Sequence, residues 1–389
     1  MNYITNLDTI IVASHFDGEL DIGLISNYTK LIFSNNNSDI KSFEEYNARD
    51  CVMKYNNKSK FNKIVNNLPS NLTHLRFNHH FNQKVNNLPE NLTHLIFGNE
   101  FNRGVDCLPP NLIYLTFGYY FNQKVDNLPP KLTYLTFNHC FDKEVNNLPS
   151  NLTNLIFGNG FNQKVNCLPS NLTYLTFGNN FNKLVDCLPK KLTRLTFGSE
   201  FNQKVDNLPE NLLDLTFDLH FNQKVDYLPK KLAHLIFGDF FNQKVDRLPF
   251  QLTHLTFGNN FNQEVNNLPL GLIHLAFGAE FNQKIDHLPE SITYLCLGNN
   301  FNQSLDDLPI FVTNIVFQSD IRGKFHHEES TYDKELNCLP NSTEFLQLPL
   351  KYNKKISRIP SKLKLIVCSN NYEYLNDFIA RNIEIDYRD

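Results

Sequence analysis

A twenty-residue period limits the possible folds of this chain more than any other feature of its sequence. Phenylalanine recurs at this spacing from Phe61 to Phe301, which gives thirteen regular copies of one motif. A copy opens with Phe-Asn, has a Leu-Pro pair in its middle and closes with a Leu-x-x-Leu-x-Phe run. Periods of this length are typical of proteins in which successive copies stack on one another.

The end of each copy predicts a short β-strand. The run around Leu75 and Phe77 alternates apolar and polar residues, as expected of a strand with one buried face. Pro69 and its equivalents exclude a helix just before that strand, because proline lacks a backbone donor and fixes its own backbone angle. We therefore expect each coil to contain a strand, a loop and an extended proline segment.

A single copy has too few apolar side chains to fold alone, so neighbouring copies must complete its core. Strands of successive coils would pair in parallel about 4.8 Å apart, with columns of Phe, Val and Leu inside. The predicted fold is therefore a repeat solenoid, mainly β, with one parallel sheet, a twenty-residue period and little helix. No long helix is expected between Phe61 and Phe317.

The repeats continue in worn form on both sides of the regular block. Leu375, Phe378, Ile379 and Ile383 near the C-terminus have helical spacing, which predicts a capping helix. The predicted organisation is, in chain order, worn repeats with an N-terminal cap (1–60), thirteen regular repeats (61–320), an insertion that breaks the period (321–331), two worn repeats (332–371) and a C-terminal cap (372–389).

Charge and composition argue against several classes of function. A net charge of -4 gives no basic footprint for nucleic acid or a membrane surface. The first residues lack a basic flank followed by a long apolar run, so we expect neither a signal peptide nor a spanning helix. We expect an intracellular, cytoplasmic protein whose eight cysteines stay reduced. Cys167 and Cys187, at one position of neighbouring copies, are the pair for which a disulfide is conceivable.

Two rows of side chains are expected on the outer face of the sheet. If Leu75 and Phe77 point inward, the residues at positions 74 and 76 point outward, and their equivalents form rows along the stack. The row through position 76, from Arg76 to Val316, is mostly small or β-branched. The row through position 74, the sheet-face row, is variable, polar and aromatic, and comprises His74, His94, Tyr114, Tyr134, Asn154, Tyr174, Arg194, Asp214, His234, His254, His274, Tyr294 and Asn314.

The complete motif, with Phe-Asn, Leu-Pro and Leu-Thr-x-Leu-x-Phe-Gly in this order, resembles the FNIP repeat family, known from amoebae and the giant viruses that infect them. The resemblance is strong from Phe61 to Asp320 and weak over most of the remainder. Leu-Pro replaces the family's Ile-Pro except at Ile359-Pro360. The resemblance implies a right-handed, leucine-rich-repeat-like stack of coils without established enzymatic activity. Some members carry an F-box before the repeats, but here that region contains worn repeats.

Two sets of repeated polar positions carry side chains that can bind metal ions. The Asn after each Phe predicts a ladder that satisfies backbone groups; a calcium ladder is the alternative, but many of its oxygens would be neutral. His234, His254 and His274 invite a zinc hypothesis, yet parallel neighbours project in a row and zinc needs converging ligands. No phosphate loop, metalloprotease helix or nucleophile elbow occurs, so we expect no enzyme, cofactor or metal site.

These observations favour an interaction scaffold that binds a partner protein along the exposed sheet face, because Tyr and Arg are residue types that anchor interfaces. A structural spacer or decoy array without a specific ligand is the alternative. Nucleic-acid binding is the weaker third hypothesis, because the row of lysines from Lys84 to Lys284 is offset by acidic residues two positions on. The residues expected to contact the partner are His74, His94, Tyr114, Tyr134, Tyr174, Arg194, Asp214, His234, His254, His274 and Tyr294.

Overall fold

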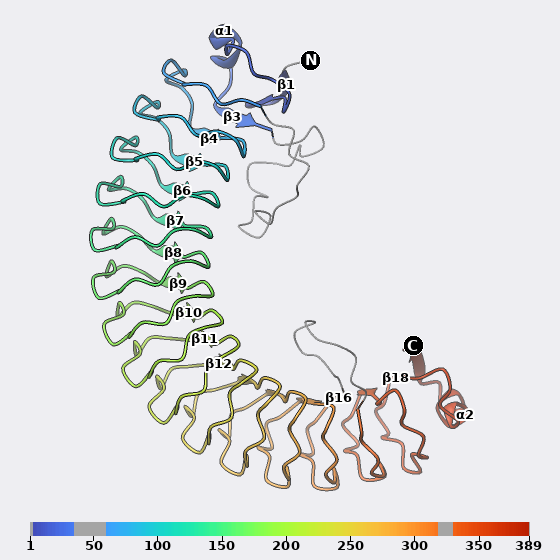
Figure 1. The fold of residues 1–389 in the computed structure, drawn as a ribbon. Helices are drawn as coiled ribbons and strands as arrows, with labels where there is room; N and C mark the ends of the chain where they lie inside the picture. The colour runs from blue at the N-terminus through green and yellow to red at the C-terminus, as the bar shows by residue number, and fades with distance from the viewer. Residues whose placement is uncertain (1–2, 35–59, 318–329, 389) are drawn as a thin grey trace. The chain divides into compact units, whose positions relative to one another are not determined.

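The computed structural model describes residues 3–34, 60–317 and 330–388 (Figure 1). They belong to two compact units, Met1–Gly198 and Ser199–Asp389. Residues 35–59 of the predicted N-terminal worn repeats and residues 321–329 of the predicted insertion lie outside the described residues.

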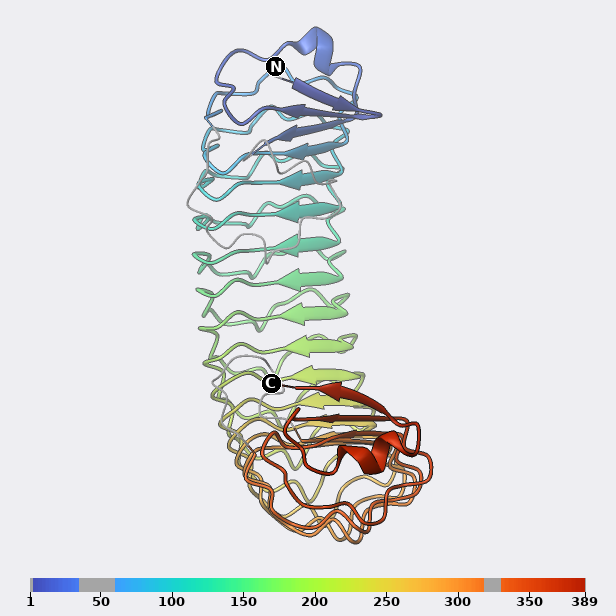
Figure 2. The same cartoon turned by 90° about the vertical axis from the view of Figure 1, so that its right-hand side faces the viewer.

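The first unit consists of coils that each contribute one short strand to a sheet (Figure 2). From β2 to β10 the neighbouring strands are parallel, and in the regular copies each residue pairs with the residue twenty positions on. The strands are β1 (Tyr3–Asn6), β2 (Thr9–Val12), β3 (Lys30–Phe33), β4 (His74–Arg76), β5 (His94–Ile96), β6 (Tyr114–Thr116), β7 (Tyr134–Thr136), β8 (Asn154–Ile156), β9 (Tyr174–Thr176) and β10 (Arg194–Thr196).

The second unit repeats this arrangement. Its strands pair in parallel from β11 to β19. The helix α2 (Leu375–Ile379) follows β18 and precedes β19 in the chain. The strands are β11 (Asp214–Thr216), β12 (His234–Ile236), β13 (His254–Thr256), β14 (His274–Ala276), β15 (Tyr294–Leu297), β16 (Asn314–Phe317), β17 (Phe345–Gln347), β18 (Leu365–Cys368) and β19 (Glu384–Tyr387).

The predicted mainly β solenoid is therefore confirmed, and residues 60–317 contain no helix. Two features at the start of the chain were not predicted. β1 pairs with β2 antiparallel, through a turn in which Leu7 has a positive φ of 41°. The four-residue helix α1 (Ile22–Ile25) follows Asp21, whose side chain accepts a hydrogen bond from the Leu24 N–H.

The C-terminal prediction was wrong in its extent. The helix α2 ends at Ile379, and Ile383 precedes the strand β19 instead of continuing the helix. Asn382 has a φ of 56°, a left-handed conformation that ends a helix. The five residues of α2 bury Phe378, and the chain then turns back onto β18.

Two ladders of phenylalanine fill the interior of each unit. In the first unit Phe81, Phe101 and Phe121 stack with ring centroids 6.1–6.2 Å apart. A second ladder through Phe97 and Phe117 has a spacing of 5.6 Å. The two ladders meet where the closing Phe of one copy lies 3.7 Å from the opening Phe of the next. These rings are at most 1% exposed, so every coil completes its core with the coils beside it.

Close backbone contact between coils explains the glycine that follows many of the inner phenylalanines. A Cβ built on Gly118 would lie 1.9 Å from the carbonyl oxygen of Gly98, and one on Gly178 would lie 2.2 Å from that of Gly158. No side chain fits between backbones at these distances, so glycine permits the close stacking.

The asparagine after each opening phenylalanine forms the predicted ladder. The Asn82 Oδ1 accepts the backbone N–H of Asn102 at 3.0 Å, and the Asn102 Oδ1 accepts that of Asn122 at 3.0 Å. Asp142, the exception in the sequence, fulfils the same role by accepting the Asn162 N–H at 2.9 Å. Each amide therefore satisfies a backbone donor of the next coil, as the ladder hypothesis required.

Candidate functional site

The sheet-face row of the first unit begins with four stacked rings. His74 stacks on His94 with centroids 4.2 Å apart and an interplanar angle of 6°. His94 stacks on Tyr114 at 5.6 Å, and Tyr114 on Tyr134 at 4.5 Å. All four side chains are half-buried. The parallel register produces this stacking, because it sets each residue beside its equivalent in the next strand.

The row continues toward β10 without this continuity of rings. Asn154 follows Tyr134 and accepts a hydrogen bond from Thr153 at 2.8 Å. Tyr174 comes next and is half-buried, and Arg194 on β10 is exposed. The row thus changes from an aromatic to a polar and cationic surface within one unit.

Threonine hydroxyls contact the ring nitrogens of two histidines in this row. The Thr73 hydroxyl donates to the Thr29 carbonyl oxygen at 3.2 Å, and the Nδ1 of His74 lies 2.8 Å from the same hydroxyl oxygen. Thr93 holds His94 in the same way, at 3.1 Å and 2.9 Å.

These imidazoles are neutral at neutral pH. Burial lowers the pKa of His74 to about 4, helped by the charges of His94 and Lys30. Burial and the charge of Lys30 also lower the pKa of His94. The aromatic part of the first unit's row therefore presents polar groups without net charge.

The sheet-face row of the second unit begins with a hydrogen-bonded contact between an Asp214 carboxylate oxygen and the Nδ1 of His234. His254 packs edge-on against His234 at 4.6 Å and stacks on His274 at 5.6 Å. His274 stacks on Tyr294 at 4.2 Å. The row ends on β16 at Asn314.

Burial is also the main cause of the lowered pKa values in this second row. It lowers the pKa of His254, assisted by the charge of His234, and the pKa of His274, assisted by the charge of His254. The three histidines of the zinc hypothesis lie in a line along successive strands. Within residues 3–34, 60–317 and 330–388, no group of three or more His, Cys, Asp or Glu side chains could hold a metal ion.

The neighbouring row, through position 76, differs from its prediction at its two ends. We expected its residues on the exposed face, but Arg76, Ile96, Thr116 and Thr136 are buried. The positions from Ile156 to Thr256 are half-buried, except for Ile236, which is exposed. In the second unit Ala276, Cys296 and Val316 are buried in an apolar cluster with Tyr294 and Phe345. Contacts across the rows cover these side chains, and alternation along a single strand does not reveal such contacts.

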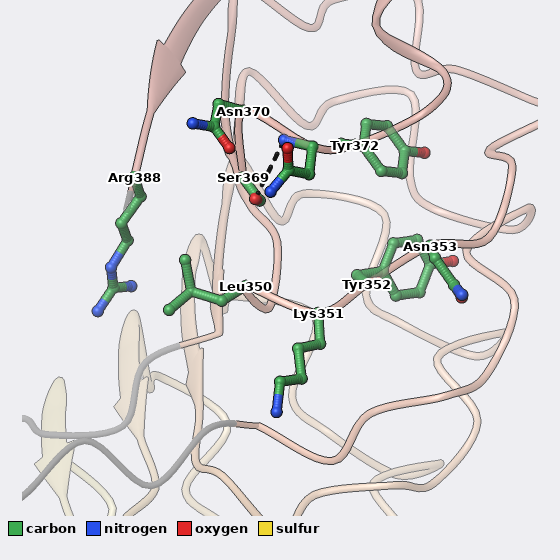
Figure 3. A pocket seen from close by; sticks show the side chains of 9 residues that line it. Leu350, Lys351, Tyr352, Asn353, Ser369, Asn370, Tyr372 and Arg388 are labelled. Atoms are coloured by element: carbon green, nitrogen blue, oxygen red, sulfur yellow. Dashed lines mark hydrogen bonds between the residues drawn. The ribbon is translucent and has the colours of Figure 1, made fainter.

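A hollow of about 560 Å³ near the C-terminus was not predicted (Figure 3). Its tyrosines serve the fold, because Tyr352 and Tyr372 donate hydrogen bonds to the carbonyl oxygens of Lys334 and Lys354. None of its nine lining residues has a carboxylate, an imidazole or a thiol; they are Leu350, Lys351, Tyr352, Asn353, Ser369, Asn370, Asn371, Tyr372 and Arg388. No sequence motif marks this hollow, and its side chains do not form a catalytic pair.

The repeated unit matches a known family model. The model of the FNIP repeat matches nine overlapping or adjacent segments between residues 61 and 319: 61–100, 104–140, 144–180, 164–200, 184–219, 201–240, 241–280, 264–300 and 281–319. The chain belongs to the FNIP repeat family. No curated protein sequence matches it.

Solved structures show the same fold for this FNIP repeat protein. CroV588, described as a novel circular LRR protein, is 34% identical with a TM-score of 0.73; the match covers 96% of this chain and 61% of CroV588. YopM from Yersinia enterocolitica is 21% identical with a TM-score of 0.52, over 88% of this chain and 73% of YopM. InlJ from Listeria monocytogenes, which includes a cysteine ladder, is 14% identical with a TM-score of 0.53, over 79% and 68%.

These likenesses establish a leucine-rich-repeat-like solenoid, and this chain spans about three fifths of the length of CroV588. In the described part of the chain, no helix is long and apolar enough to span a membrane.

Proposed function

We propose that this FNIP repeat protein is an interaction scaffold that binds a partner protein along the sheet-face rows of its two units. The observation that carries the proposal is the contrast between constant and variable positions. The Phe, Leu and Asn positions repeat because the stack needs them, whereas the sheet-face row changes from coil to coil through His, Tyr, Asn, Arg and Asp. Variable residues on a rigid, periodic support are what solenoids use to recognise partners.

The chemistry of the rows fits a protein surface better than a polyanion. Tyr114 and Tyr134 present large, rigid side chains, the type that anchors protein interfaces. The histidines beside them are neutral at neutral pH, and Arg194 is the single cation of the first unit's row. Nucleic-acid binding instead requires several cations along one face.

A site-specific photo-crosslinking experiment tests the proposal. A photoreactive phenylalanine analogue replaces Tyr134 in one variant and Leu184, an exposed residue of the same unit outside the row, in a control variant. We expect a partner from the lysate of the source organism to crosslink at Tyr134 and not at Leu184. Tyr114→Ala together with Tyr134→Ala should then weaken binding of that purified partner at least about tenfold. Equal crosslinking at both positions, or none at either, would favour a structural spacer.

A further inference from the structure

A second row of exposed residues follows the Leu-Pro pairs, at the turn that precedes each strand. We call it the corner row. Its first-unit members are polar or proline, such as Ser70, Glu90 and Pro110. In the second unit the row is, in chain order, Glu210, Lys230, Phe250, Leu270, Glu290 and Ile310, all of them exposed.

Phe250 and Leu270 make the middle of this second-unit row apolar. Phe250 is 68% exposed and Leu270 is 85% exposed, although the same position is polar or proline throughout the first unit. Ile273, in the same coil as Leu270, is also exposed. The fold does not need apolar side chains here, since the polar corners of the first unit belong to coils of the same construction. A contiguous exposed apolar patch of this kind marks an interaction surface.

Gly271 removes a side-chain contact between the corners of Phe250 and Leu270. Equivalent residues in other coils bridge to the preceding corner, as Asn171 does by donating to the Ser150 carbonyl oxygen at 2.9 Å. Gly271 has no side chain for this bridge, and a Cβ placed on it would meet only the Phe250 carbonyl oxygen, at 3.8 Å. Crowding therefore does not require glycine at position 271. The missing side chain of Gly271 instead lets another surface approach the corner closely.

The charges beside this patch are arranged symmetrically around it. Lys230 lies one coil before Phe250, and Glu290 lies one coil after Leu270, so the row is cation, apolar, apolar, anion. The Glu290 carboxylate accepts the Ile310 N–H at 3.3 Å, which helps to hold it at its end of the row. A two-fold axis between the positions of Phe250 and Leu270 exchanges the two apolar residues and also exchanges Lys230 with Glu290.

We propose that a second copy of this chain docks here, with the two corner rows antiparallel. Phe250 of each copy then meets Leu270 of the other, and Lys230 of each copy meets Glu290 of the other. Such a contact is isologous and closes after two copies. A membrane or a nucleic acid would favour cations at both ends of the patch, and the anion at one end disfavours them.

The strength of this association follows from its size. Neighbouring corners are about 5 Å apart, the spacing of adjacent strands, so four corners extend over roughly 15 Å. This contact is smaller than a standard interface of about 800 Å² on each partner, and we expect a dissociation constant on the order of 100 µM. The dimer is independent of the sheet-face rows, so its test does not depend on the proposed function.

Sedimentation velocity of the full chain over about 5 to 500 µM should show a monomer–dimer equilibrium in this range. Leu270→Lys should raise the dissociation constant at least about tenfold, because it places two cations at the centre of the contact. Leu184→Lys is the matched control, since Leu184 is 60% exposed but belongs to the first unit, and it should leave the equilibrium unchanged. A chain that stays monomeric throughout, or a dimer that Leu270→Lys does not weaken, overturns the proposal.

A charge exchange tests the two-fold arrangement itself. Lys230→Glu and Glu290→Lys should each weaken the dimer at least about threefold, and the two substitutions together should restore it. Glu290→Lys also removes the acceptor of the Ile310 N–H, so thermal unfolding of each variant must show that the coil remains folded. If the folded double variant dimerises no better than the single variants, the antiparallel arrangement is wrong.

Discussion

Phe117→Ala tests the interior of the stack most directly. Phe117 is fully buried, lies 3.7 Å from Phe121, which opens the next copy, and lies 5.6 Å from Phe97 and 5.6 Å from Phe137, its equivalents in the copies on either side. Truncating a buried phenylalanine removes its transfer free energy and leaves a cavity, which together cost about 3 to 5 kcal/mol. The substitution also weakens two interfaces between coils, and a one-dimensional stack has no other contacts to compensate.

Tyr114→Ala is the matched control in the same coil. Its ring lies on the sheet face, half-buried, and stacks on Tyr134 and His94. Loss of such contacts at a partly exposed site should cost about 1 kcal/mol or less. Urea unfolding followed by far-UV circular dichroism compares the variants, because the chain has no tryptophan for fluorescence. Equal losses of stability in the two variants would contradict the assignment of inner and outer faces on which the proposed binding rows depend.

Three further predictions concern the contacts between coils and the response to acid. Asn102→Ala should cost about 1 to 3 kcal/mol in urea unfolding, because the Asn122 N–H loses its acceptor, whereas Asn102→Asp should be nearly neutral. Gly178→Ala should destabilise by more than about 3 kcal/mol, since its Cβ would lie 2.2 Å from a backbone oxygen. Gly104→Ala should be tolerated, because its Cβ would make only an ordinary contact of 3.9 Å with the Asp106 carboxylate; equal melting temperatures would refute this. The pKa of His74 falls from 6.5 to about 4 on folding, so the unfolded chain binds more protons between these values. Stability should therefore fall as the pH is lowered through this window, and His74→Gln should reduce the slope in thermal melts.

The regular coils could be predicted from the sequence because each local choice recurs at the same position. Leu75 and Phe77 set the strand, Pro69 excludes a helix before it, and the period places every copy beside its equivalent. The chain ends lack this redundancy. At the C-terminus the spacing of Leu375 and Phe378 indicates a helix. That helix ends at Ile379, Asn382 has a left-handed conformation, and the residues after it form the strand β19.

The sheet-face rows could also be predicted from the repetition of each position. The burial of the side chains on that face could not. Alternation places Tyr114 and Thr116 on the same face of β6, yet Thr116 is buried and Tyr114 is half-buried. The difference depends on contacts between rows, which one strand cannot reveal. The exposed Phe250 and Leu270 were visible in the sequence as departures from the polar residues at this position, but their meaning depends on the coordinates of the corner turn.

The asparagine ladder affects how the gene for this protein can change in length. In the first unit the Asn82 side chain accepts the backbone N–H of Asn102, and the Asn102 side chain accepts that of Asn122. Each asparagine thus bonds to the following coil. If residues 101–120 were lost, Asn82 would meet Asn122 with the same acceptor and the same donor. A loss of ten residues would instead halve one coil and place unlike positions side by side where that coil meets its neighbours. Recombination between neighbouring copies can therefore add or remove blocks of twenty codons without unfolding the product, and natural variants of this protein should differ in length by whole coils.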